Sequence, residues 1–483
     1  MHTPRRPGPP SARRPASASG RRVLATLLVA VCAGLAGWSS PAWLPALRPG
    51  EDSPPATRAL PSAAPSPRGA VPPDPGAPLP GAAEVAAVVG PALEAAPAGR
   101  RSVLVADALT GAPLFEHDAD SALVPASNQK LVTLLSLLTH ADPGERLRTT
   151  VVEGDDPGTV VLVAGGDTLL RPGRSDPDAV LGRAGVRTLA QETARALAAR
   201  GAGAPTTVRW DAGLFPGPAG NEAWAAGDVA AGQIGPVAPM AFWSHRVPAG
   251  DGFSPARPDD AAAAVAAVFA AELAAALAEE GIAAPAPLLV PGPAPRSAAE
   301  LAAVESATLA EQAGLMVQDS DNHLAEVLSR IAARAAGHPG SIAGGRSAAA
   351  EALAARGIDP EGLELSDASG MSLDNRAPAR ALEHVVRAMV ADSTGSLAQG
   401  ARALPVAGGS GTLVERFDDE PEAAARGLAR AKTGTLNSVV SLSGHVTTQE
   451  GRLLTFSVVL NEVTDPAAAR DAADRAVAAL AAL

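Results

Sequence analysis

Two lysines in short motifs are the residues of this chain whose types and spacing best suit chemistry. Lys130 ends the tetrapeptide Ser127-Asn128-Gln129-Lys130, and Lys432 begins Lys432-Thr433-Gly434. They are the only lysines among 39 Lys and Arg residues, so arginine is used wherever positive charge alone is sufficient. A guanidinium does not lose its proton in a protein, whereas a buried lysine amine can act as a base. A serine beside such an amine is an activated nucleophile, and the pattern indicates serine acyl transfer.

A third motif, Ser320-Asp321-Asn322, lies between the other two. The order S-x-x-K, S-D-N, K-T-G is typical of penicillin-binding proteins and class A β-lactamases. Each motif alone could be a helix cap or a turn. Because both lysines of the chain fall inside the set, we interpret the three motifs as one catalytic site.

The motifs predict a role for each catalytic residue. An apolar run follows Ser127, which places this serine at a helix N-terminus with Lys130 one turn further along the same face. Ser127 is the expected nucleophile and Lys130 its base, if burial and a neighbouring cation keep the amine neutral. Ser320 can relay the proton to the leaving amine, and Asn322 can hold Lys130 and a substrate amide.

The K-T-G segment predicts the substrate-binding side of the site. Lys432, with the hydroxyls of Thr433 and Thr435, suits an anionic carboxylate on the substrate. Gly434 allows the backbone to approach a ligand closely. The backbone N–H groups of Ser127 and Thr435 are the expected oxyanion donors.

Beyond the motifs, the chain resembles the class C low-molecular-mass penicillin-binding proteins, the D-alanyl-D-alanine carboxypeptidase/endopeptidase family of serine peptidases. The stretches that carry the resemblance are Asp211 with Phe215 and Trp224, Ser320 to Glu326, Asp367 to Ser372, Leu404 to Gly408 with Gly411 to Leu413, and Lys432 to Leu436. The resemblance runs from about residue 83 to the C-terminus. It implies an α/β (α+β) fold of the β-lactamase/transpeptidase type, with a mainly antiparallel sheet flanked by helices.

The long gap between Ser127 and Ser320 fits the extra domains that this family inserts between its first two motifs. We therefore expect a catalytic domain over residues 83–145 and 297–483, and one or more inserted domains over 146–296. The resemblance implies cleavage of peptidoglycan stem peptides that end in D-Ala-D-Ala, with acylation of Ser127 by β-lactams and no cofactor.

Other functions fit the same motifs. A serine β-lactamase would differ in rapid deacylation, and a non-catalytic cell-wall-binding protein could use the same fold. A simple esterase is a further alternative.

The N-terminus predicts export. Residues 1–38 combine an Arg-rich segment with an apolar run from Val23 to Trp38, the pattern of a signal peptide or membrane anchor. Residues 39–82 are rich in Pro and Ala and predict an extended spacer. We expect an extracytoplasmic protein of the cell envelope, secreted or anchored, whose N-terminal segment can contact the membrane.

Composition excludes several other classes of function. The formal net charge of −12 argues against nucleic acid as a partner. Cys32 is the single cysteine, and the eight histidines show no ligand spacing, so we expect no metal site.

Several polar and aromatic residues outside the motifs are expected to have structural roles. Asp367 and Asp374 suit loop capping better than catalysis. His323 has no part in the predicted chemistry, and tryptophans such as Trp224 and Trp243 are expected in the core or at domain contacts.

Periodicity predicts the elements that must position these residues. We expect a hairpin over 102–116 and helices over 83–96, 186–200, 260–281, 300–313, 321–336, 347–356 and 466–483. Strands are expected over 159–164 and 207–210, and in the two apolar runs 436–446 and 453–461.

Overall fold

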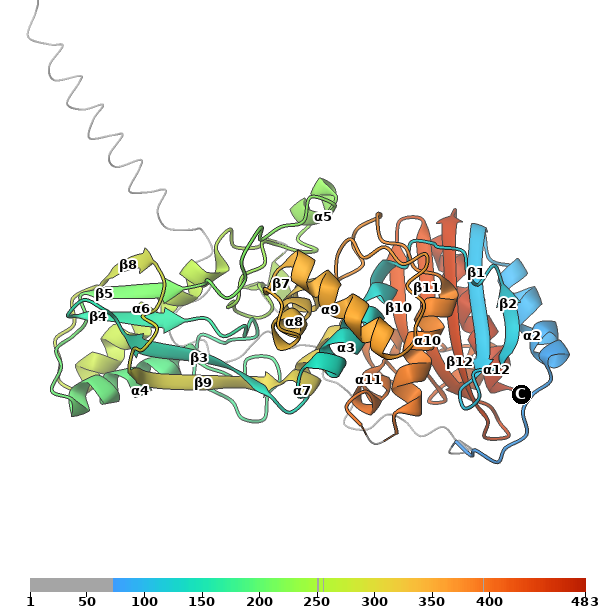
Figure 1. Cartoon of the computed structure of the whole chain (residues 1–483), viewed down its shortest axis with the longest axis horizontal. Coiled ribbons are helices and arrows are strands. Elements are labelled where there is room, and N and C mark those ends of the chain that lie inside the picture. The colour runs from blue at the N-terminus through green and yellow to red at the C-terminus, as the bar shows by residue number, and fades with distance from the viewer. Residues whose placement is uncertain (1–72, 250–251, 255, 394) are drawn as a thin grey trace, which may run out of the picture. The chain divides into compact units, whose positions relative to one another are not determined.

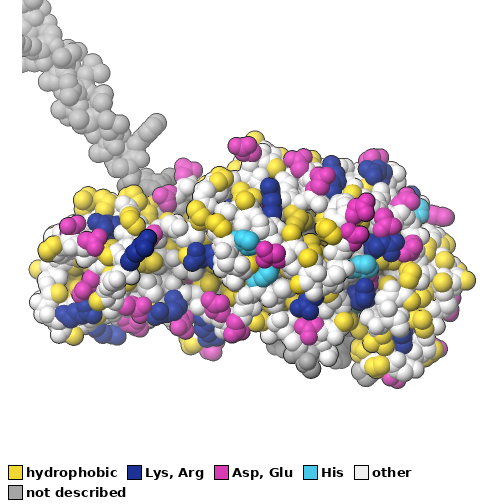
Figure 2. Space-filling model, in the orientation of Figure 1, with side chains coloured by type: hydrophobic (Ala, Val, Ile, Leu, Met, Phe, Trp, Pro, Cys, Tyr) yellow, Lys and Arg dark blue, Asp and Glu magenta, His cyan; other side chains and the backbone are white. Residues whose placement is uncertain are grey.

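The computed structural model describes residues 73–249, 252–254, 256–393 and 395–483. The predicted export segment and the spacer up to residue 72 lie outside these ranges. Two five-stranded sheets and one two-stranded sheet organise the described chain (Figure 1). On the face drawn in Figure 2, basic and acidic side chains are interspersed.

The first sheet is antiparallel and joins strands from distant parts of the sequence. In spatial order its strands are β10 Ala429–Leu436, β11 Val439–Thr447, β12 Leu453–Val463, β1 Ala98–Asp107 and β2 Pro113–His117. β1 pairs with β12, with Ser102 opposite Val459. The predicted hairpin is present as β1 and β2.

Helices cover both faces of this sheet. α2 Ala82–Glu94 and α12 Pro466–Ala481 pack together against one face, and α10 Ala379–Ala391 packs against the other (Figure 1). Apolar side chains such as Val89 and Val477 form a core with the strands. The sheet with its helices is the α/β (α+β) arrangement predicted from the sequence.

A buried helix, α3 Gln129–His140, packs against α10. It packs against α8 Asn322–Ala335 and α9 Ile342–Ala355, and every residue from Gln129 to Leu138 is buried. A helix surrounded by other elements must be largely apolar all round. Lys130 is thereby placed in the interior of the protein.

The second sheet is mixed. Its strands, in spatial order, are β8 Leu288–Pro291, β5 Thr207–Asp211, β4 Thr159–Val163, β3 Arg146–Glu153 and β9 Glu300–Thr308. Two helices, α4 Val186–Ala199 and α6 Ala261–Glu279, pack together and against this sheet. α6 is long and apolar enough to cross a membrane, but 67% of its apolar window is buried inside the protein, as in a core helix.

Shorter elements connect the larger ones. They are the hairpin of β6 Val247–Ala249 and β7 Gly252–Ser254, the helices α5 Ala226–Ala230, α7 Leu309–Gln318 and α11 Ala398–Ala403, and the 3-10 turns η2 Ala126–Asn128, η3 Gly411–Leu413 and η4 Glu422–Ala425.

The helix predicted over 300–313 is wrong in its first part. Residues Glu300–Thr308 form β9 and pair with β3, and α7 begins only at Leu309. Pairing with β3 outweighs the helix propensity of the Ala and Glu residues here. The second sheet therefore extends beyond residue 296, the end that we predicted for the inserted domains; the division into domains itself stays a prediction.

Candidate active site

Ser127 lies in the 3-10 turn η2, directly before α3. The preceding residue, Ala126, has a left-handed backbone with φ 47°. Such a conformation is unfavourable for alanine and persists only where the surroundings impose it. Here the turn is held by Ser441, whose Oγ donates a hydrogen bond of 2.7 Å to the carbonyl of Pro125.

The Lys130 amine has three acceptors from three parts of the chain. Its Nζ donates to Ser127 Oγ at 3.2 Å, to Asn322 Oδ1 at 2.7 Å and to the carbonyl oxygen of Ser369 at 2.6 Å. The side chain is 0% exposed. The predicted contact between Ser127 and Lys130 is therefore present, and Ser369 is a partner that the sequence did not indicate.

Burial favours the neutral form of Lys130. It lowers the pKa of Lys130 to about 8, although the carboxylates of Asp367, Asp321 and Glu326 oppose the shift. The neighbouring cation is Lys432, and here the effect runs from Lys130 to Lys432: burial, followed by the charge of Lys130, lowers the pKa of Lys432 well below its ordinary value.

The S-D-N motif forms the turn between α7 and α8. Ser320 has a left-handed backbone with φ 55°. Asp321 caps α8, because its Oδ1 accepts a 2.9 Å hydrogen bond from the N–H of Leu324. Its other carboxylate oxygen is paired with Arg246. The turn therefore has a fixed conformation, with Asn322 as the first residue of α8.

The K-T-G motif lies on β10, one of the two edge strands of the first sheet. Lys432 Nζ donates to Ser320 Oγ at 2.9 Å and to the carbonyl oxygen of Thr433 at 2.7 Å. The site thus contains two serine–lysine pairs, Ser127 with Lys130 and Ser320 with Lys432.

Gly434 brings β10 close to the nucleophile. A Cβ at this position would lie 3.0 Å from the backbone N of Ser127 and 2.2 Å from Ser441 Oγ. Only glycine fits such an approach. Beside it, Thr433 Oγ1 donates to Thr412 Oγ1 at 2.9 Å, while Thr435 is exposed.

A cavity of about 560 Å³ opens beside these residues. Its lining includes Ser320 and Asn322 of the S-D-N motif and Thr412, together with Gln233 and Arg246 from the segment predicted as an insert. Asn322 Nδ2 donates to the carbonyl oxygen of Gln233 at 3.2 Å. The segment predicted as an insert therefore contributes a wall of the candidate active site.

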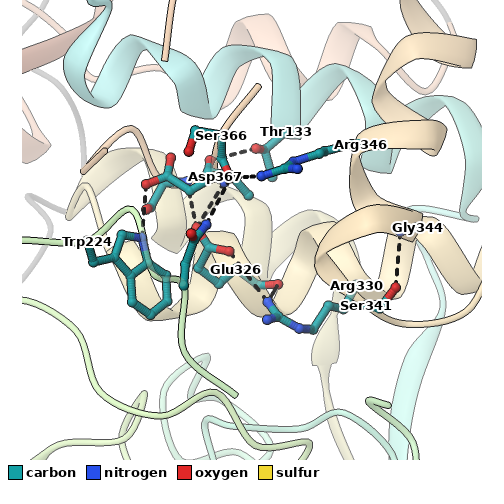
Figure 3. A network of polar contacts seen from close by, with 12 residues as sticks. Thr133, Trp224, Glu326, Arg330, Ser341, Gly344, Arg346, Ser366 and Asp367 are labelled. Atoms are coloured by element: carbon teal, nitrogen blue, oxygen red, sulfur yellow. Dashed lines mark hydrogen bonds and ion pairs between the residues drawn. The ribbon is translucent and has the colours of Figure 1, made fainter. Parts of the chain in front are cut away.

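Figure 3 shows a polar network around Asp367. Asp367 Oδ1 accepts from the N–H of Gly370 at 2.7 Å, and Oδ2 accepts from the N–H of Ser372 at 2.8 Å and from Trp224 Nε1 at 3.0 Å. The expected loop-capping role of Asp367 and contact role of Trp224 are confirmed.

Several residues of the site had no individual signal in the sequence. Ser369, Gln233, Arg246 and Thr412 act through contacts between distant segments, although Ser369 and Thr412 belong to stretches that resemble the family. His323 is buried, with its ring 4.9 Å from that of His245, and burial holds its pKa well below the ordinary value, in keeping with a structural role. Within the described ranges no group of three or more His, Cys, Asp or Glu residues could hold a metal ion.

Comparison with known proteins agrees with the assignment of the three motifs to a serine peptidase site. The family model described as D-Ala-D-Ala carboxypeptidase 3 (S13) matches residues 82–249 and 254–483. Carboxypeptidase DacB of Mycolicibacterium smegmatis is 36% identical over 401 residues, which cover 81% of this chain and 83% of the relative.

Solved structures share the fold. Penicillin binding protein 4 from Haemophilus influenzae matches with a TM-score of 0.64 and 19% identity, over 80% of this chain and 97% of that one. The same protein complexed with a β-lactam matches with a TM-score of 0.56 and 19% identity, over 78% and 93%. Motifs, family model and relatives agree, and the chain belongs to the D-Ala-D-Ala carboxypeptidase 3 (S13) family of serine peptidases, the class C low-molecular-mass penicillin-binding proteins.

Proposed function

We propose that Ser127 is the residue through which this D-Ala-D-Ala carboxypeptidase forms its acyl-enzyme on peptidoglycan stem peptides. One observation carries the proposal: the fully buried amine of Lys130 lies 3.2 Å from Ser127 Oγ. A neutral amine at this distance can take the hydroxyl proton, which makes the oxygen nucleophilic.

The first step is attack on the penultimate D-Ala carbonyl. The Ser127 proton moves to Lys130 Nζ while the Oγ–carbon bond forms, and the developing oxyanion is stabilised by the backbone N–H groups of Ser127 and Thr435. The close approach of Gly434 to Ser127 supports this pairing of donors.

Release of D-Ala follows. The carbon–nitrogen bond breaks, and the leaving amine takes the proton that Lys130 had received from Ser127, relayed through Ser320, which is hydrogen-bonded to Lys432. Asn322 Oδ1 accepts a hydrogen bond from Lys130 Nζ at 2.7 Å, and binding of a substrate amide by the same side chain is part of the proposal. Water then hydrolyses the ester on Ser127 and restores the enzyme.

Lys432, Thr433 and Thr435 are proposed to receive the terminal carboxylate of the substrate. A bound carboxylate would favour the charged form of Lys432, and the resulting repulsion would help to keep Lys130 neutral. The exposed hydroxyl of Thr435 is available for direct contact.

Acylation by β-lactams tests the role of Ser127. The Haemophilus influenzae relative has been solved in complex with a β-lactam, which supports β-lactam binding by this chain. Labelled penicillin should mark Ser127 in the intact protein and should leave Ser127→Ala unmarked. A folded protein that takes up no label, like its Ser127→Ala variant, would contradict the assignment.

Muropeptides test the reaction itself. Incubation with purified pentapeptides and cross-linked muropeptides, followed by mass spectrometry, should show loss of one D-Ala, and the cross-linked substrates reveal any endopeptidase action. A long-lived penicilloyl-enzyme would separate this function from that of a β-lactamase.

The proposed site of action is the cell envelope. It rests on the Arg-rich, apolar and Pro-rich pattern of the N-terminal residues. Fractionation of cells that express the full chain, with N-terminal sequencing of the mature protein, distinguishes a secreted form from an anchored one.

A further inference from the structure

Glu326 is a buried carboxylate at the active site that none of the three motifs includes. It lies on α8, about one turn after Asn322, and is 2% exposed. Its Oε1 accepts hydrogen bonds from two successive backbone N–H groups, those of Ala368 at 2.9 Å and Ser369 at 3.0 Å. Figure 3 shows the side chain directed at this loop.

The same loop supplies an acceptor to Lys130. The carbonyl oxygen of Ser369 lies 2.6 Å from Lys130 Nζ. Thr133 Oγ1 donates to the carbonyl oxygen of Ala368 at 2.7 Å, and Asp367 Oδ1 accepts from Gly370 N–H at 2.7 Å. The peptides on both sides of Ser369 are therefore fixed, and Glu326 provides two of the hydrogen bonds.

The direction of the Lys130 lone pair depends on these acceptors. A neutral amine has two N–H groups and one lone pair. If Asn322 Oδ1 and the Ser369 carbonyl oxygen accept the two N–H groups, the lone pair is left to face Ser127 Oγ. Both acceptors are set by α8, one through Asn322 itself and the other through Glu326.

We propose that Glu326 is a positioning residue for Lys130, because it fixes the Ser369 carbonyl that orients the Lys130 amine toward Ser127. The inference rests on the proposed role of Ser127 and Lys130. Glu326 does not touch the reacting atoms, and it acts through the loop.

The charge of Glu326 gives the proposal a separate readout. Arg330 Nη1 lies 3.4 Å from Glu326 Oε2, so the carboxylate has a buried partner. Glu326 also belongs to the carboxylates that raise the pKa of Lys130 against the effect of burial. Removal of its charge should make Lys130 lose its proton at a lower pH.

The test compares Glu326→Gln with wild type and with Glu272→Gln. Glu272 is a matched control, since it is also buried and paired with an arginine, Arg187, at 3.1 Å, but it lies on α6. The rate of acylation by labelled penicillin is measured between pH 5 and 10, together with thermal stability. We expect Glu326→Gln to acylate at least ~10-fold more slowly at its optimum, with the acidic limb of the profile moved to lower pH.

Glu272→Gln should retain the wild-type acylation rate and the wild-type pH of the acidic limb, even if it lowers thermal stability as much as Glu326→Gln does. A Glu326→Gln variant with the wild-type rate and limb would overturn the proposal, as would a loss of stability with no change in either. If Glu326→Gln does not fold, Glu326→Asp is tested instead, because it keeps the charge but has a shorter side chain. We expect a slower acylation rate with the acidic limb at the wild-type pH, and an unchanged rate overturns the proposal.

Failure of the proposed function gives a different result, because folded wild type itself would then take up no label on Ser127.

Discussion

Lys130 and Lys432 are alike in burial and differ in what they touch. Both are 0% exposed and both donate a hydrogen bond to a serine of the motifs. Only Lys130 contacts the expected nucleophile. The need for an amine that can lose its proton is therefore specific to Lys130.

Arginine substitutions should separate the two lysines. Lys130→Arg should lower the acylation rate by at least ~10²-fold, because a guanidinium cannot act as a base. Lys432→Arg places a permanent positive charge where the substrate carboxylate is proposed to bind, and should retain more activity. Both larger side chains overpack a buried site, so melting temperatures are measured alongside the rates. The reverse order of activities would contradict this division of roles.

The pH dependence of acylation should follow Lys130. Its pKa is lowered to about 8, and the neutral form is the base, so the rate should rise with pH through this value. The measurement is the rate of penicillin acylation from pH 6 to 10. A rate that falls across this range, with the protein still folded, would exclude Lys130 as the base.

At the scale of elements, the edge strand β10 and the turn at Ser127 must fit closely. A Cβ on Gly434 would lie 3.0 Å from the backbone of both Ser127 and Pro125. Either the strand or the turn would have to move.

Gly434→Ala should therefore lower the acylation rate by at least ~10-fold, since small displacements of reacting groups are costly. The control is Gly314→Ala in α7, where a Cβ meets nothing within 4 Å and alanine should stabilise the helix by about 0.5–1 kcal/mol. Wild-type acylation by Gly434→Ala would show that the close approach is unimportant.

Local sequence pattern predicted some parts of this site and not others. The spacing of Ser127 and Lys130 is itself a helical distance, so their contact followed from the sequence. β10 was not predicted as a strand, because its residues depend on pairing with β11. The contacts by which Ser369 and Glu326 orient Lys130 were not predicted either, since they form only when a loop and a helix that are distant in the sequence pack together.

At the scale of the whole molecule, an ion pair between Arg246 and Asp321 links the segment predicted as an insert to the S-D-N motif. Burial raises the pKa of Asp321, but Arg246 and the cap of α8 outweigh it and hold the pKa at about 2. A carboxylate with a lowered pKa stabilises the fold above its unfolded pKa, and this contribution is lost as pH falls toward 2.

Arg246→Gln should therefore lower the free energy of unfolding by about 2 kcal/mol at neutral pH. This loss of unfolding free energy should shrink as pH falls from 4 toward 2, as measured by urea denaturation of both proteins. Acylation should also slow, because Asp321 caps the helix that carries Asn322. A deficit that is independent of pH would contradict this account of the pair.

The pairing of β1 with β12 has a consequence for the order of events during synthesis. Residues 98–107 emerge from the ribosome long before residues 453–463, their partners in the sheet. Lys432, on β10, also comes late. The nascent chain therefore carries Ser127 and Lys130 without the sheet that completes their surroundings, and we expect a chain shortened to residue 450 to take up no penicillin label.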